Sequence, residues 1–161
     1  MKVTPVSPSS KWNTAIKKCI SSATGLDNEC VFKQWQNSGL ATRYDNCASF
    51  SLRNAEMEGR PYVSRGEYRT NYKLDYFVTF YGNSARNNAQ KFLAFMFLQQ
   101  AKDILYPADM AYTTGYVLAG FAEIINTRAY NRTDVNLTFS AFLSEKEADY
   151  IDKINLSFYL G

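Results

Sequence analysis

Alternation of apolar and polar residues marks two unusually long stretches of this chain. In the first, residues 67–81, the odd positions begin with charged and polar side chains, while the even positions are mainly aromatic or aliphatic. The set predicted to face inward is Tyr68, Thr70, Tyr72, Leu74, Tyr76, Val78 and Phe80. A period of two is typical of a β-strand with one buried and one solvated face. At about 3.3 Å per residue this strand would span roughly 50 Å, which is longer than most strands.

Residues 130–143 repeat the pattern with the parity reversed. The positions predicted to face inward are Thr133, Val135, Leu137, Phe139, Ala141 and Leu143, and those predicted to face outward are Arg132, Asp134, Asn136, Thr138 and Ser140. Two strands of this length are longer than the core of a compact domain of this size. We therefore expect a sheet that projects from the domain or is completed by a neighbouring subunit.

Apolar residues spaced by three and four predict two helices. The first runs from residue 11 to about residue 24, with Gly25 as its C-cap. The second opens at Asn83-Ser84 and continues to about Tyr106, where Pro107 stops it. Residues 1–10, with two prolines and three serines, are expected to form an irregular arm.

The remaining segments predict shorter strands joined by short turns. These strands are expected at residues 30–36, 46–57, 115–126 and 150–160, with extended structure resuming at 62–63 and a polar turn at 144–147. Consecutive strands with short connections are antiparallel. The predicted fold class is α+β: a twisted, mainly antiparallel sheet with two long amphipathic strands, flanked by an N-terminal helix and one long central helix. We expect one domain over residues 11–161.

Composition excludes several classes of chemistry. The 161 residues include no histidine, so neither a Ser-His-Asp triad nor a histidine metal site can form. The three cysteines form no Cys-x-x-Cys pair and are expected to be buried free thiols: Cys19, Cys30 and Cys47. The nearest match to a phosphate-binding loop, residues 115–120, lacks the required Lys and Ser or Thr. We therefore expect no enzyme, no cofactor and no bound metal.

Two binding functions remain open after this exclusion. Arg69 and Lys73 lie among tyrosines, which could form a surface for single-stranded nucleic acid, but alternation places these tyrosines on the opposite face. The net charge of +3 is too small to favour nucleic acid or anionic lipid. No apolar run approaches the roughly 20 residues of a membrane helix, and we expect a soluble protein. Self-assembly is the better hypothesis, because long amphipathic strands suit a subunit that completes its sheet in an oligomer.

The succession of segments resembles the neck or tail terminator proteins of tailed bacteriophages, also called tail-completion proteins. The segments that carry the resemblance cover residues 11–161 in order: the first helix with Trp12, Ala15, Ile16 and Ile20, leading to Ala23-Thr24-Gly25-Leu26; the strand 31–37; Phe80-Tyr81-Gly82 directly before Asn83 and Ser84; residues 122–126; Tyr130-x-Arg132 leading into Val135-x-Leu137; and residues 151–154.

This resemblance implies a homohexameric ring of a virion, at the head-proximal end of the tail tube, assembled in the host cytoplasm. Its implied partners are the tail tube protein, the sheath in contractile phages and the head-completion or connector proteins, with DNA passing through the lumen unread and no membrane contact. The residues that we expect at subunit interfaces are Trp35, Gln36, Arg69, Lys73, Arg132 and Asp134. The alternatives are another tail or neck subunit, such as a tube or connector protein, and a nucleic-acid-binding module.

Overall fold

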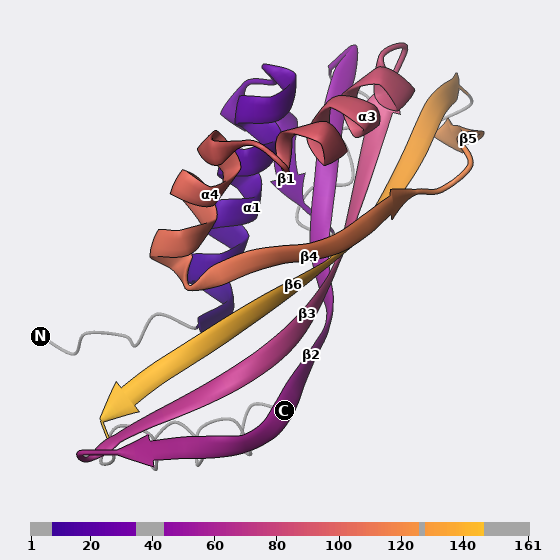
Figure 1. Cartoon of the computed structure of the whole chain (residues 1–161). Coiled ribbons are helices and arrows are strands. Elements are labelled where there is room, and N and C mark those ends of the chain that lie inside the picture. The colour runs from indigo at the N-terminus through magenta and orange to yellow at the C-terminus, as the bar shows by residue number, and fades with distance from the viewer. Residues whose placement is uncertain (1–7, 35–43, 126–127, 147–161) are drawn as a thin grey trace, which may run out of the picture.

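The computed structural model describes residues 8–34, 44–125 and 128–146 (Figure 1). Its α-helices are α1 (Pro8–Thr24), α3 (Ala85–Phe95) and α4 (Gln99–Leu105), with short 3₁₀ turns η1 (Asn28–Cys30) and η2 (Tyr106–Ala108). Its strands are β1 (Val31–Lys33), β2 (Asn46–Ser64), β3 (Glu67–Gly82), β4 (Met110–Val117), β5 (Phe121–Ile125) and β6 (Arg128–Lys146).

The six strands of the described residues form one mixed, mostly antiparallel sheet in the order β1-β2-β3-β6-β4. β5 pairs with β6 beyond the end of β4, so β4 and β5 follow one another along the same side of β6. β2, β3 and β6 are the long strands. The α+β class and the mainly antiparallel sheet are confirmed. The pairing of β1 with β2 is parallel, which makes the sheet mixed.

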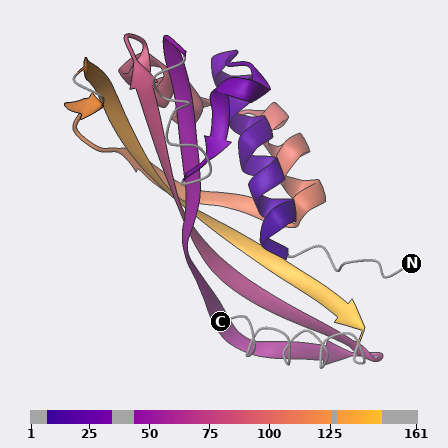
Figure 2. The same ribbon diagram turned by 180° about the vertical axis from the view of Figure 1, so that it is seen from behind.

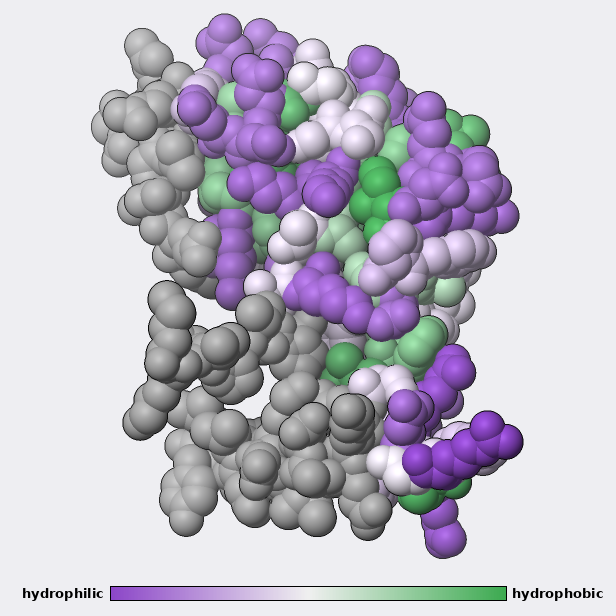
Figure 3. Space-filling model, turned by 90° about the vertical axis from the view of Figure 1, so that its left-hand side faces the viewer, coloured by the Kyte–Doolittle hydropathy of each residue, from purple (hydrophilic) through white to green (hydrophobic). Residues whose placement is uncertain are grey.

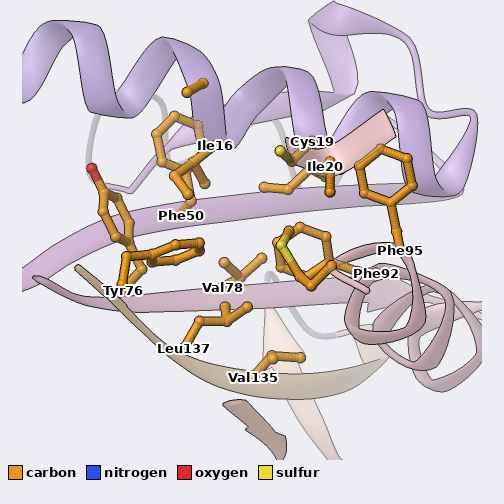
Figure 4. Close-up of a cluster of buried hydrophobic side chains, with 14 of the residues drawn as sticks. Ile16, Cys19, Ile20, Phe50, Tyr76, Val78, Phe92, Phe95, Val135 and Leu137 are labelled. Carbon is orange, nitrogen blue, oxygen red and sulfur yellow. The ribbon is translucent and has the colours of Figure 1, made fainter. Parts of the chain in front are cut away.

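The helices lie together on one face of the sheet (Figures 1 and 2). Figure 4 shows the core between the helices and the sheet, with Ile16 and Ile20 of α1 and Phe92 of α3 pointing toward Val78 and Leu137 of the sheet. The positions of β3 and β6 predicted to face inward are buried or half-buried, so alternation identified the core face correctly: Tyr68, Thr70, Tyr72, Leu74, Tyr76, Val78 and Phe80 on β3, and Thr133, Val135, Leu137, Phe139, Ala141 and Leu143 on β6.

The expected projecting sheet is present. Toward one end of the sheet, residues 53–64, 67–73 and 140–146 of β2, β3 and β6 continue as a three-stranded extension, which we call the arm (Figure 1). At the base of the arm, Tyr72 still packs against Trp12 of α1. Arg65 and Gly66 close its hairpin with φ angles of 52° and 77°. Two positive φ angles in a two-residue connection define a type I′ turn, whose twist matches that of the strands it joins.

The predicted long central helix is broken into α3 and α4. Leu98 has extended backbone angles, φ −86° and ψ 155°, and separates the two helices. The ring of Phe97 packs edge-on against Tyr112 of β4, with 5.6 Å between centroids. A single straight helix would place one apolar stripe on a strongly twisted sheet. The break allows Phe92 of α3 and Leu105 of α4 each to be buried.

Several element boundaries also differ from the sequence prediction. α1 begins at Pro8, so residues 8–10 are helical and not part of an irregular arm. The expected strand 115–126 is divided into β4 and β5, and residues 144–146 continue β6 where a turn was expected. Extended structure does not stop at residue 57, because β2 passes residues 59–61 through a register shift. The predicted strand 150–160 lies outside the described residues.

Candidate subunit interface

The face of the sheet opposite the helices carries the polar positions of the long strands, and we call it the polar face. Cross-strand neighbours on this face include Tyr81 with Arg132, Thr79 with Asp134, and Asp75 with Thr138. The hydroxyl of Thr138 donates a hydrogen bond to Asp75 over 3.0 Å. Four of the six residues predicted at interfaces belong to this face: Arg69, Lys73, Arg132 and Asp134.

Arg132 and Asp134 form the centre of a charged network near β5. The guanidinium Nε of Arg132 donates to Asp134 Oδ1 over 2.9 Å, and its Nη1 donates to Glu123 over 3.1 Å. Thr79 donates a further hydrogen bond of 2.9 Å to the same oxygen of Asp134. Burial lowers the pKa of Arg132, but the hydrogen bond and charge of Asp134 outweigh this, so the net pKa lies above its ordinary value. The guanidinium is therefore a permanent cation held between two carboxylates.

Asp134 was predicted to face outward into solvent, and it is instead only 5% exposed. At this end of the sheet the polar face is partly covered, because Thr79 and Asp134 are buried while the side chain of Arg132 is still 19% exposed. A second, smaller hydrophobic cluster forms there around Cys30 and Cys47, with Phe32 and Tyr81 packed against it. Tyr81 is the cross-strand neighbour of Arg132, so the ion pair lies next to this cluster. The two residues thus contact each other within one chain, and their predicted contact with a neighbour stays a prediction.

Arg69 and Lys73 lie on the arm, at the other end of the polar face. The guanidinium of Arg69 stacks over the ring of Phe142, 3.9 Å from its centroid. Lys73 is exposed and has Glu56 of β2 and Ser140 of β6 as cross-strand neighbours. The structure therefore does not bring these two residues near Arg132 and Asp134. Trp35 and Gln36 lie outside the described residues.

Alternation also separates the arm's cations from the buried tyrosines, as predicted. Tyr76 is 1% exposed, and its hydroxyl donates a hydrogen bond of 2.8 Å to Asn13 of α1. Its ring is part of the core, where no nucleic-acid base can stack on it. The polar face instead pairs cations with phenylalanines: Arg53 lies 4.5 Å from the centroid of Phe77.

The three cysteines are buried free thiols, as the sequence predicted. Burial raises the pKa of Cys19 and of Cys47 to about 12, which keeps both thiols protonated and unreactive near neutral pH. Within the described parts of the chain, no group of three or more Cys, Asp or Glu side chains is arranged to hold a metal ion. No helix of these same parts is long and apolar enough to cross a membrane.

A groove of about 540 Å³ lies where the arm meets η2 and the start of β4. Its charged lining residues are Glu58, Arg69 and Asp109. Asp109 is already engaged, because it accepts a hydrogen bond from the ammonium group of Lys11 of α1. Arg69 is stacked on Phe142 in the same groove. Of these three charged residues, Asp109 is therefore held in an ion pair and Arg69 is stacked on an aromatic ring.

Several large apolar side chains remain exposed at the surface of the described residues. Phe97 is 73% exposed and Leu98 52%, both at the break between α3 and α4. Others lie on the arm and near β5, including Tyr62, Val63 and Ile124. Figure 3, which shows the face on the left of Figure 1, has hydrophobic residues in small patches among hydrophilic ones. In the sequence, the run Phe92–Leu98 is the longest unbroken apolar stretch, and it indicates more apolar side chains than one face of a helix can bury.

The described residues form an α+β fold whose long strands extend one end of the sheet. In comparisons with known proteins, the family of the phage neck terminator protein matches residues 13–159. The chain therefore belongs to the phage neck terminator protein family, and it is a structural protein of a phage-type virion.

No curated protein matches the chain. Among solved structures, a chain described as "Virion of native gene transfer agent (GTA) particle" is 14% identical, with a TM-score of 0.36. The match covers 82% of this chain and 93% of that one.

Proposed function

We propose that this protein forms a hexameric ring at the head-proximal end of a phage tail tube, stops growth of the tube and joins it to the head connector. Membership of the neck terminator family supports this function. The observation that carries the proposal is the arm, because its three paired strands project from the part of the sheet that the helices cover. An exposed extension of this kind gains burial when a neighbouring subunit packs against it.

A ring can end a tube by geometry alone. Head-to-tail contacts between identical subunits form a closed ring when a whole number of equal rotations completes one turn. In this proposal the rotation between neighbours is one sixth of a turn. One face of the closed ring then matches the end of the tail tube, and the other presents a different surface to the head connector. In a contractile phage the same ring would also end the sheath. No catalytic step is needed, and DNA passes through the lumen without being read.

The experiment that tests this function is a capping assay with purified tail tube protein. Tubes that assemble with the protein present are expected to stop at limited length and to carry one ring at one end in negative-stain images. Tubes of unchanged length without a terminal ring would contradict the function. Filaments of the protein itself would instead favour the tube-subunit alternative.

Trp35 provides a variant for the same assay, since the sequence predicts that it contacts a neighbouring subunit. The Trp35→Ala variant is expected to form fewer rings and to cap fewer tubes at equal protein concentration. Large aromatic residues contribute strongly to interfaces, so the loss is expected to reach roughly tenfold in apparent affinity. If W35A rings form as readily as those of the wild-type protein, Trp35 is not at the interface.

A further inference from the structure

The edges of the sheet differ in how they are protected against pairing with another strand. Soluble proteins commonly place charges, prolines or bulges on exposed edge strands to prevent such pairing. The exposed outer half of β2 follows this rule with Arg53, Glu56, Glu58, Arg60 and Pro61, and with two register shifts. This edge is built to stay unpaired.

β4 is the last strand on the other side of the sheet, and it lacks most of this protection. Its sequence, Met-Ala-Tyr-Thr-Thr-Gly-Tyr-Val, contains no charged residue and no proline, and one register shift lies between Tyr112 and Thr114. In the described part of the chain, β6 is the strand that pairs with β4, and no strand lies on its outer side. Thr113, Thr114 and Tyr116 are exposed along it.

Large apolar side chains flank this edge. Phe97 packs against Tyr112 of β4 and is still 73% exposed, and Leu98 beside it is more than half exposed. On the polar face, Tyr116 of β4 is 56% exposed while its hydroxyl accepts a hydrogen bond from Asn136. A strand added to β4 would gain backbone hydrogen bonds and cover apolar side chains above and below the sheet.

We propose that the outer edge of β4 pairs with a strand of a second copy of this chain, so that the sheet continues across the subunit boundary of the ring. The inference rests on the proposed ring and names the surface that closes it.

A second copy is the occupant that fits the sheet order. β1 and β4 lie at opposite sides of one sheet, so pairing β4 of one copy with the β1 side of the next is a head-to-tail contact. In a closed ring every copy then has both sides occupied.

The test compares Thr114→Lys with Thr14→Lys by sedimentation velocity over a range of concentrations. Both positions are exposed, and the substitution is the same, but Thr14 lies on α1. T114K places a charge on the edge of β4 and is expected to lower the association constant at least tenfold, whereas T14K assembles like the wild-type protein. A second variant, Phe97→Asp, removes apolar surface at a 73% exposed position and is expected to act like T114K.

Hydrogen exchange of the wild-type protein provides an independent measurement. Backbone amides of residues 110–117 are expected to exchange more slowly in the assembled state than in the dilute monomer. If T114K and F97D assemble as well as the wild-type protein, the proposed β4 contact is wrong, although the ring itself can still form. Unchanged hydrogen exchange in β4 on assembly would have the same meaning. A wild-type protein that stays monomeric at every concentration, with and without tail tubes, would overturn both.

Discussion

At the scale of single residues, Asp134 shows how a charge is held inside this sheet. It accepts hydrogen bonds from Thr79 and Arg132, and Arg132 is shared with Glu123. A buried carboxylate requires such partners, because an unpaired charge in this environment is costly. The network ties β3 and β6 to β5, which lies beyond the end of β4.

Replacing Asp134 by alanine is expected to lower the free energy of unfolding by about 1–3 kcal/mol, since Arg132 loses one of two carboxylate partners. Urea unfolding measures the change. Asp27→Ala is the matched control, because Asp27 is exposed and its side chain caps nothing, so an effect within about 0.5 kcal/mol is expected. Equal effects of D134A and D27A would contradict a structural role of the network.

Burial also predicts how stability depends on pH. The pKa of Cys19, Cys47 and Tyr81 is raised to about 12, and that of Tyr76 is raised above its ordinary value, in each case chiefly by burial. The folded state therefore holds these protons more tightly than the unfolded chain. These groups contribute fully to the free energy of unfolding below about pH 9, and this contribution is lost as the pH rises toward 12.

We expect the free energy of unfolding to decline between about pH 9 and pH 10.5, after being nearly constant from pH 7 to pH 8. Urea titrations at these pH values measure it. In Cys19→Ala the decline is expected to be shallower, although the core is weakened at every pH. A constant free energy up to pH 10.5 would contradict the assignment.

At the scale of elements, the junction between β3 and α3 depends on Gly82. Its φ angle is 108°, and a Cβ atom there would lie 2.0 Å from the backbone oxygen of Asp45. Ser84 stands at the N-cap position of α3, but its side chain makes no capping hydrogen bond, and its N–H donates to Asn46 Oδ1 over 3.0 Å. The side chain of Asn46 on β2 thus supplies a hydrogen-bond acceptor at the start of the helix.

Gly82→Ala is expected to destabilise the protein by more than about 3 kcal/mol, because backbone must move to admit the methyl group. Gly66→Ala in the arm's turn is the control: its φ is also positive, at 77°, but its Cβ would meet open space. Strain alone predicts a cost of about 1–2 kcal/mol there. Thermal unfolding of the two variants distinguishes them, and equal losses would mean that the contact with Asp45 is unimportant.

The elements that the sequence predicted best are those with long, regular patterns. Alternation identified the core faces of β3 and β6 because one side of each strand meets helices along much of its length. The parallel direction of β1 was not predicted, because the sequence indicated only a mainly antiparallel sheet. β1 ends at Lys33 and β2 begins at Asn46, which leaves enough chain for a crossover to a parallel strand. The burial of Asp134 could not be predicted either, because alternation does not reveal the second cluster around Cys47.

At the scale of the whole molecule, the long strands divide the chain into a packed body and an arm. Charged residues such as Arg53, Glu56 and Arg60 protect the arm's β2 edge, while β4 carries no charge. The molecule therefore has one edge suited to water and one suited to another strand. In the proposed ring, β4 of one copy pairs with the β1 side of the next, and the charged β2 edge of the arm stays outside that strand pairing. Six-fold symmetry is what the family resemblance implies for this ring.

The most direct test of the central claim is the mass of the wild-type protein in solution, measured by light scattering at several concentrations and two salt levels. We predict a species of six times the 18.4 kDa chain whose mass does not grow further as the concentration rises. A mass that keeps increasing with concentration would mean an open polymer, and it would contradict a ring that terminates the tail.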